Sequence, residues 1–130
     1  MRLLAISDLH LNRAQNLAAL RELPPHPDDW LMLAGDLGDG PEHLELAFSL
    51  LSSRFARLFW VPGNHELWAT RGAATRGEAR YAALIAVCRA WGVVTPEDPV
   101  VTWEGPGGPA RVVPLFTLYD HSWRPDHVSA

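Results

Sequence analysis

Three short, unbroken runs of apolar residues recur along the first half of the chain. They are residues 3–6, 30–34 and 58–61. Continuous hydrophobicity over so few residues is typical of strands that are buried on both faces of a parallel sheet. Each run is followed at once by a cluster of polar residues and glycines. The pattern therefore predicts three parallel strands with polar side chains at their carboxyl ends.

The segments between and after these runs carry the spacing of amphipathic helices. The clearest case is a set of four residues spaced i, i+3, i+4 and i+7, namely Leu44, Ala47, Phe48 and Leu51. Pro41 suits the first turn of that helix. A weaker pattern around Leu17 and Leu20 predicts a helix that stops before Pro24, and a third pattern runs from Tyr81 to Cys88. Strands that alternate with helices predict an α/β fold built from βαβ units.

The polar clusters at the strand ends are evenly spaced. Twenty-eight positions separate Asp8 from Asp36, and the same number separates Asp36 from Asn64. A βαβ unit takes about 30 residues, so each step corresponds to one such unit. The three clusters should therefore lie at the same edge of one sheet, where open α/β folds bind their ligands.

The last third of the chain has a different texture. Residues 100–103 and 111–116 are largely apolar and flank a glycine- and proline-rich turn at residues 105–109, which predicts a C-terminal hairpin. At 130 residues with 48% hydrophobic content, we expect residues 1–130 to form a single domain. Tyr119, Asp120, His121 and Arg124 are interpreted as ordinary surface residues rather than phosphate contacts.

Composition and charge exclude several classes of function. The net charge is −4 and no basic stripe is present, so duplex nucleic acid is not expected as a partner. All 11 cationic residues are arginine, which excludes lysine Schiff-base chemistry and a Walker-type phosphate loop. Cys88 is the only cysteine, so it cannot form an intrachain disulfide, and we expect a reducing, cytoplasmic location. No apolar run is long enough to predict a membrane span or a signal peptide.

The strand-end clusters supply the donors of a divalent metal site. Asp8, His10, Asp36, Asn64 and His65 offer carboxylate, imidazole and amide groups, a mixture that suits Mn, Fe or Zn. A shared carboxylate can hold two ions about 3.5–4 Å apart, the separation used for in-line phosphoryl displacement. Taken singly, Asp8 could be a cap and residues 35–40 a glycine-rich turn. Their joint occurrence at three successive strand ends favours a metal site.

The three clusters resemble the first three signature blocks of calcineurin-like metallophosphoesterases. The matching segments are Asp8-Leu9-His10, Gly35-Asp36-Leu37-Gly38-Asp39 and Gly63-Asn64-His65-Glu66. The resemblance implies a metallophosphoesterase-type αββα sandwich, of which this chain holds a part. It also implies that Asp8 and His10 ligate a first metal ion, that Asp36 bridges two ions, and that Asn64 ligates the second.

The same resemblance assigns the catalytic roles. His65 would be the proton donor, and Asp39 would orient His65 and stabilise its protonated form. The implied activity is phosphoester hydrolysis by a metal-bound hydroxide at a dinuclear centre. The implied substrate is a small-molecule phosphoester, a nucleotide or a phosphoprotein.

The resemblance through these motifs covers residues 1–66. The family's later blocks, a lone metal-binding histidine and a Gly-His-x-His segment, have no counterpart, and the late histidines His121 and His127 stand in other contexts. We therefore expect a C-terminally truncated domain in which the second ion binds weakly or not at all. An uncovered sheet edge would then favour association with another chain.

A different class of function is left open by the missing blocks, namely a catalytically inert metal-binding or interaction module. A dinucleotide-binding fold is disfavoured, because no Gly-x-Gly-x-x-Gly turn follows the first strand. Cys88, Trp30 and Trp60 are interpreted as core residues, whereas Trp68 could line the mouth of a pocket beside the Asn-His pair.

Overall fold

A computed structural model describes residues 1–69, 73–117 and 125–128. In chain order the elements are β1 (Leu3–Ile6), α1 (Ala14–Glu22), β2 (His26–Leu33), α2 (Pro41–Leu51), β3 (Phe55–Trp60), α3 (Asn64–Leu67), α4 (Gly77–Ala90), β4 (Val101–Trp103) and β5 (Ala110–Val112). The three predicted strands and the three predicted helices are all present. The very short helix α3 was not predicted, since its residues were assigned to a polar strand-end cluster.

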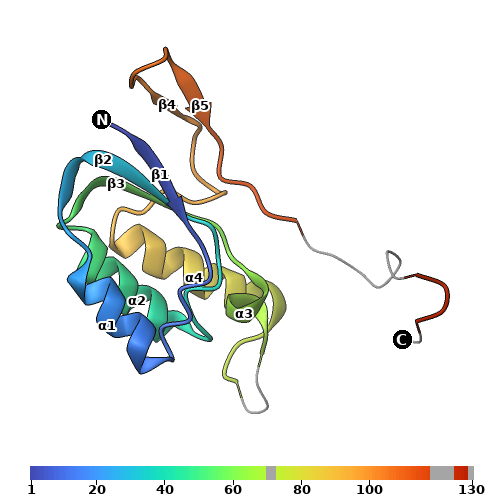
Figure 1. Cartoon of the computed structure of the whole chain (residues 1–130). Helices are drawn as coiled ribbons and strands as arrows, with labels where there is room; N and C mark the ends of the chain where they lie inside the picture. Colours follow the sequence, from blue (N-terminus) through green and yellow to red (C-terminus); the bar gives the residue numbers. More distant parts are fainter. Residues whose placement is uncertain (70–72, 118–124, 129–130) are drawn as a thin grey trace.

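The sheet is parallel and its strands follow the order β1-β2-β3. Leu31 of β2 lies opposite Leu4 of β1 and Leu58 of β3. Beyond β3 the chain adds a short parallel bridge, in which Val94 pairs with Phe59. Because consecutive βαβ crossovers are almost always right-handed, strands added in one direction place their helices on one face. Figure 1 shows α1, α2 and α4 on the same side of the sheet.

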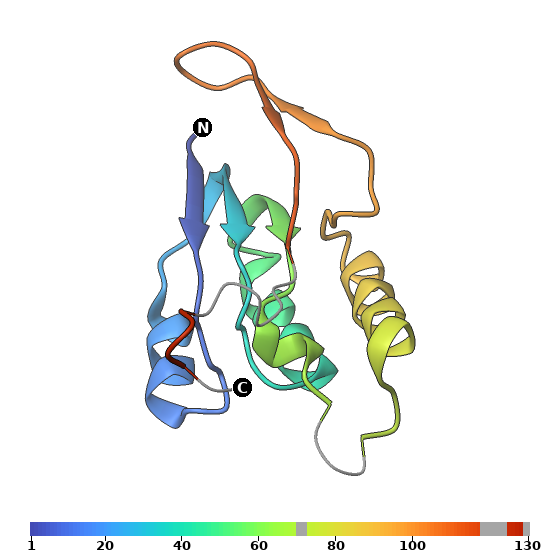
Figure 2. The same cartoon turned by 90° about the vertical axis from the view of Figure 1, so that its right-hand side faces the viewer.

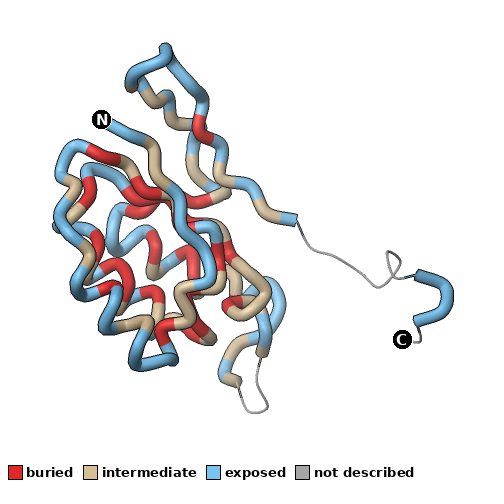
Figure 3. The backbone as a smooth tube through the Cα atoms, viewed as in Figure 1, coloured by how far each residue is buried: buried red, intermediate tan, exposed pale blue. Residues whose placement is uncertain are grey.

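The core lies between this face of the sheet and the helices (Figure 3). Leu31, Leu33, Leu58 and Trp60 of the strands are buried together with the predicted helical face of α2, which is Leu44, Ala47, Phe48 and Leu51. Cys88 is also buried, as predicted, and burial raises the pKa of its thiol to about 12. The predicted amphipathic spacing therefore identifies the residues that hold the helices on the sheet.

Trp60 is fully buried, but the prediction that Trp30 belongs to the core is only partly right. Trp30 is half-buried on the opposite face of the sheet, where its ring packs 5.5 Å from that of Phe59 and lies under the guanidinium of Arg57. The pleat explains the difference, because neighbouring positions such as Trp30 and Leu31 point to opposite faces.

The predicted C-terminal hairpin is present as the antiparallel pair β4–β5, which lies apart from the helical layer (Figure 2). The segment that follows it passes over the second face of the sheet, because Val112 and Leu115 line a small pocket with Met32 and Phe59. The fold is thus α/β with βαβ units and a hairpin on the side away from the helices. Among the described residues no helix is both long enough and apolar enough to cross a bilayer.

Strand β2 begins earlier than the hydrophobic pattern predicts, at His26 rather than Trp30. Its first residues are polar, but Asp29 accepts the backbone N–H of Arg2 at 2.7 Å and the guanidinium of Arg2 at 2.6 Å. His26 stacks on Phe55 with ring centroids 5.3 Å apart. Tertiary pairing therefore extends the strand through residues whose polarity alone would place them in a loop.

Candidate metal centre

The loops after β1 and β2 run side by side at the carboxyl edge of the sheet. The backbone N–H of Asp8 donates to the carbonyl of Gly35, and that of His10 donates to the carbonyl of Asp36, both at 3.0 Å. Strand pairing thus continues into the loops. This brings two clusters that lie far apart in the sequence into direct contact, as their even spacing predicted.

Three of the predicted site residues have left-handed backbone conformations. The φ angles are +57° at Asp8, +41° at His10 and +55° at Asp36. Residues with a Cβ atom rarely adopt such angles, and each costs of order 1–3 kcal/mol unless the surroundings impose it. Strain of this kind gathers at functional sites, and here it falls on three candidate ligands.

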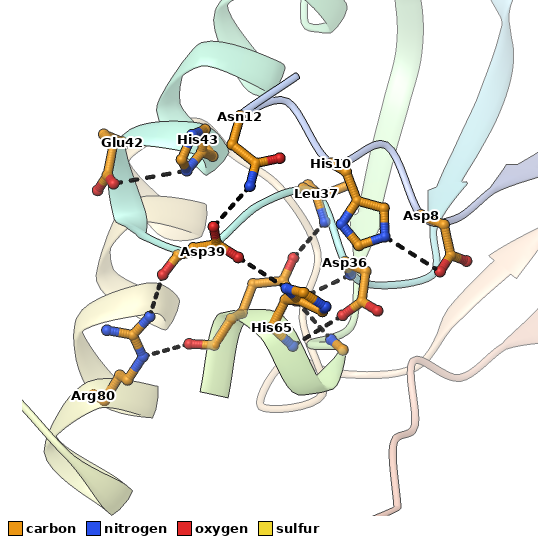
Figure 4. Close-up of polar contacts among 12 residues, drawn as sticks. Asp8, His10, Asn12, Asp36, Leu37, Asp39, Glu42, His43, His65 and Arg80 are labelled. Carbon is orange, nitrogen blue, oxygen red and sulfur yellow. Dashed lines mark hydrogen bonds and ion pairs between the residues drawn. The ribbon is translucent and has the colours of Figure 1, made fainter. Parts of the chain in front are cut away.

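A cluster of possible metal ligands forms where the loops meet (Figure 4). Ligand atoms of His10, Asp36 and His65 all lie within 4.8 Å of one another. The imidazole rings of His10 and His65 meet edge to face, with centroids 4.7 Å apart. The carboxylate of Asp8 lies 3.7 Å from Nε2 of His10. One carboxylate between two imidazoles, with a second carboxylate beside them, is a donor set that fits a borderline divalent cation.

Asn64, the remaining predicted ligand, is the first residue of α3 and follows β3 directly. It lines a pocket next to this cluster together with Gly63 and Trp68. The structure therefore gathers Asp8, His10, Asp36 and His65 closely and places Asn64 beside them. The roles of Asp8, His10, Asp36 and Asn64 as ligands, and that of His65 as proton donor, stay predictions.

Asp39 and His65 lie within hydrogen-bonding distance of each other, as the prediction that Asp39 orients His65 requires. Oδ1 of Asp39 lies 2.8 Å from Nδ1 of His65, and Oδ2 accepts a hydrogen bond from the side chain of Asn12 at 2.8 Å. The hydrogen bond to Asp39 raises the pKa of His65, and the same bond lowers the pKa of Asp39. Asn12, which sequence reasoning passed over, turns the carboxylate so that its other oxygen faces the imidazole.

Glu66 has a structural role at the site that the sequence analysis did not predict. Its side chain is fully buried and accepts three backbone N–H groups, those of Asp36 at 3.0 Å, Leu37 at 2.6 Å and Gly63 at 2.9 Å. Burial raises the pKa of this carboxyl, while the backbone hydrogen bonds oppose the rise. A single carboxylate thus ties the loop after β2 to the loop after β3.

Two further contacts bring the same loops together. The backbone N–H of His65 donates to Oδ1 of Asp36 at 3.0 Å. A Cβ atom on Gly63 would lie 2.1 Å from that oxygen, so glycine is required at this position. The short helix α3 can therefore approach Asp36 closely enough for its backbone to orient the carboxylate.

Arg80 of α4 is a buried cation behind the site, and its contacts are with backbone carbonyl groups. Nη2 donates to the carbonyl of Asp39 at 2.5 Å, and Nε donates to the carbonyl of Glu66. Arg80 therefore connects the backbone on both sides of the Asp39–His65 pair. The helical pattern of residues 81–88 predicted α4. Extending it by one position would place Arg80 on the buried face with Leu84 and Cys88, a signal that the charge of the side chain obscured.

The predictions for Tyr119, Asp120, His121 and Arg124 lie outside the described residues. His127, one of the two late histidines, is exposed. In the described part of the chain the candidate ligands accordingly come from the strand-end loops.

Comparison with known sequences identifies the class of protein. The pattern of the family described as calcineurin-like phosphoesterase matches residues 1–124. The chain belongs to the calcineurin-like phosphoesterase family, as the three signature blocks predicted.

The chain is also similar to one named protein and to one solved structure. The chain is 46% identical over 125 residues to the [acyl-carrier-protein] phosphodiesterase PptH of Mycobacterium tuberculosis (strain ATCC 25618 / H37Rv), a match that covers 94% of this chain and 39% of that protein. The crystal structure of phosphopantetheinyl hydrolase (PptH) from M. tuberculosis is similar with a TM-score of 0.88 and 44% identity, covering 99% of this chain and 47% of that one. The chain thus spans less than half the length of these relatives.

Proposed function

We propose that this chain forms the metal-binding part of a phosphoesterase that hydrolyses a phosphodiester with the help of two divalent metal ions. The observation that carries the proposal is the convergence of His10, Asp36 and His65, with ligand atoms within 4.8 Å of one another at the end of a parallel sheet. Membership of the calcineurin-like phosphoesterase family supports the same reaction class.

In this proposal the metal ions would be held by Asp8, His10, Asp36 and Asn64, with Asp36 contributing to both. Bound divalent ions would activate water and neutralise charge on the phosphate oxygens. Mn, Fe and Zn all suit this set of carboxylate, imidazole and amide donors. The second ion has fewer donors among these residues than the first, so we expect it to bind more weakly.

His65 would deliver a proton to the departing oxygen of the ester. Its hydrogen bond to Asp39 raises its pKa and so increases the protonated fraction near neutral pH. Proton transfer of this kind typically contributes 10²–10⁴-fold to the rate. Asn12 and Arg80 would act as positioning residues, because they hold the side chain and the backbone of Asp39, respectively.

The proposed substrate is a phosphodiester between a phosphopantetheinyl group and an acyl carrier protein. The support for it is the 46% identity, over 94% of this chain, to a protein named as an acyl-carrier-protein phosphodiesterase, together with the similar crystal structure of a phosphopantetheinyl hydrolase. Such a substrate contains one phosphodiester flanked by two organic groups. A site at an open sheet edge, rather than in an enclosed cavity, is compatible with a protein-bound substrate.

The test combines a general substrate with the specific one. Hydrolysis of bis(p-nitrophenyl) phosphate is measured with Mn²⁺, Fe²⁺ or Zn²⁺ and after chelation, and loss of the phosphopantetheinyl group from a carrier protein is followed by mass spectrometry. We expect metal-dependent turnover that Asp36→Ala abolishes. His65→Ala should reduce turnover while sparing metal content, and His127→Ala, which removes an exposed histidine, should change neither. Turnover that needs no metal and survives Asp36→Ala would contradict the proposal.

A further inference from the structure

A pocket of about 440 Å³ opens beside the candidate metal centre. Its walls come from segments far apart in the sequence, with Pro62, Leu67 and Trp68 around α3 and Phe116 from the segment after β5. Asn64 belongs both to this pocket and to the predicted metal ligands. A group attached to a phosphate at the metal centre would therefore find this pocket next to it.

Trp68 lines this pocket with a side chain that is partly exposed to solvent. The residue follows α3 directly and is 54% exposed. The ring packs against the imidazole of His65, with centroids 4.6 Å apart, so that it is fixed next to the predicted proton donor. Phe116 is in turn held by Tyr81 of α4, with ring centroids 5.4 Å apart. The rings of Trp68 and Phe116, each packed against a neighbouring aromatic ring, thus line an open, partly apolar space.

The chemistry of the walls limits what can bind there. Among the described residues that line the pocket, the polar side chains are those of Asn64 and Thr117, and none is ionisable. Transfer of a charged group from water into such surroundings is unfavourable without a partner of opposite charge. A second phosphate or a carboxylate would find no cation among the described residues of these walls, whereas aliphatic carbon and neutral amide or hydroxyl groups would be accepted.

We propose that the pocket framed by Trp68 and Phe116 binds an uncharged, partly apolar organic group of the phosphoester, while its phosphate lies at the metal centre. This inference rests on the proposed function, and it adds a selection for neutral over charged ester groups. Trp68 would contribute through contact of its ring with the carbon chain. The compact methyl ester of a phosphate would leave the pocket unfilled.

Phosphonates test the inference without requiring turnover. The dissociation constants of methylphosphonate, butylphosphonate and a butylphosphonate whose terminal methyl is replaced by a carboxylate are measured calorimetrically on the full chain with Mn²⁺. Butylphosphonate has three more methylene groups than methylphosphonate, and burying about half of their surface in this open pocket should make it bind about tenfold more tightly. The carboxylate-bearing ligand should lose most of this gain.

Two variants of Trp68 and one control test whether the tighter binding of butylphosphonate depends on the pocket. Trp68→Ala should bring the butyl-to-methyl affinity ratio close to one, and Trp68→Phe should retain much of the ratio. Trp91→Ala, which removes another exposed tryptophan at the far end of α4, should leave it unchanged. Circular dichroism confirms that each variant is folded.

The outcomes separate this inference from the proposed function. Equal affinity for all three ligands, or a butyl gain that survives Trp68→Ala, would overturn the pocket assignment and leave the metal centre intact. A failure of all three phosphonates to bind in the presence of Mn²⁺ would overturn the proposed function and the pocket assignment together.

Discussion

The carboxylate of Glu66 in α3 accepts the backbone N–H of Asp36 at 3.0 Å, although α3 follows β3 and Asp36 lies in the loop after β2. The same carboxylate accepts the N–H groups of Leu37 and Gly63, so its oxygens face three donors in a fully buried position. An anion with three backbone donors fixes both loops at once. The spacing between Asp36 and the start of α3 is therefore set by a side chain that does not itself belong to the metal-ligand cluster.

Glu66→Gln should weaken both folding and metal binding. Glutamine keeps the size of the side chain, but its amide nitrogen is a donor and would face N–H donors, leaving at least one of them without an acceptor. An unsatisfied buried group costs about 1–3 kcal/mol of unfolding free energy. Urea denaturation and Mn²⁺ titration measure the two effects, with exposed Glu78→Gln in α4 as the control. Unchanged stability and unchanged metal affinity would show that the carboxylate does not hold the loops.

Arg80→Met tests the second connection behind the site. The variant keeps an apolar stem in α4 but removes the donors to the carbonyls of Asp39 and Glu66. Hydrogen bonds to charged groups contribute about 1.5–3 kcal/mol, so we expect a loss of unfolding free energy in this range. Arg80→Lys should recover only part of it, because an ammonium group lacks the planar fork that reaches two carbonyls.

Steady-state kinetics show whether Arg80 positions the catalytic pair or only stabilises the fold. Because Arg80 holds the backbone next to the Asp39–His65 pair, Arg80→Met should lower kcat more than it raises KM at a temperature where the variant remains folded. Arg76→Met, an exposed substitution one turn earlier, serves as the control. Equal effects of both variants would assign Arg80 no special part in the site.

The left-handed backbone at His10 predicts that two variants of this residue differ in stability but not in metal affinity. The φ angle is +41° and alanine cannot adopt it without strain, whereas glycine can. His10→Gly should therefore be more stable than His10→Ala by about 1 kcal/mol, while both lose metal affinity to a similar degree. Thermal denaturation of the metal-free variants measures the difference in stability, and Mn²⁺ titration measures the loss of metal affinity. Equal stability of the two variants would mean that the loop relaxes when the histidine is removed.

Much of this architecture could be predicted from periodicity and spacing. Continuous apolar runs predicted β1, β2 and β3, and the interval of 28 residues predicted that Asp8, Asp36 and Asn64 follow strands at one edge of a sheet. These signals are local or periodic, and a parallel βαβ arrangement converts them directly into spatial proximity.

The parts that could not be predicted depend on contacts between residues with no such signal. Burial of Glu66 and Arg80 arises where the strand-end loops meet α4. Arg80 stands on the same helix face as Leu84 and Cys88, but the predicted apolar pattern begins at Tyr81, so its charge placed it outside the predicted stripe. The polar start of β2 exists because Asp29 pairs with Arg2, a contact 27 residues apart in the sequence. Helix α3 is a single turn between two loops, too short for a periodic pattern to form.

The pair of Arg2 and Asp29 at the opposite end of the sheet gives a pH-dependent prediction that is independent of the metal centre. The hydrogen bond from Arg2 lowers the pKa of Asp29 below that of an unfolded aspartate, which is about 3.9. The folded state therefore gains stability from this carboxylate above pH 3.9 or so, and the gain is lost as the pH falls through the lower folded pKa. Arg2→Gln should lower the free energy of unfolding near neutral pH, and its difference from the parent protein should shrink on acidification. Urea denaturation between neutral pH and about pH 3, with exposed Arg13→Gln as the control, measures this difference. A difference that stayed constant across this range would mean that Arg2 stabilises the sheet by packing rather than through the charge of Asp29.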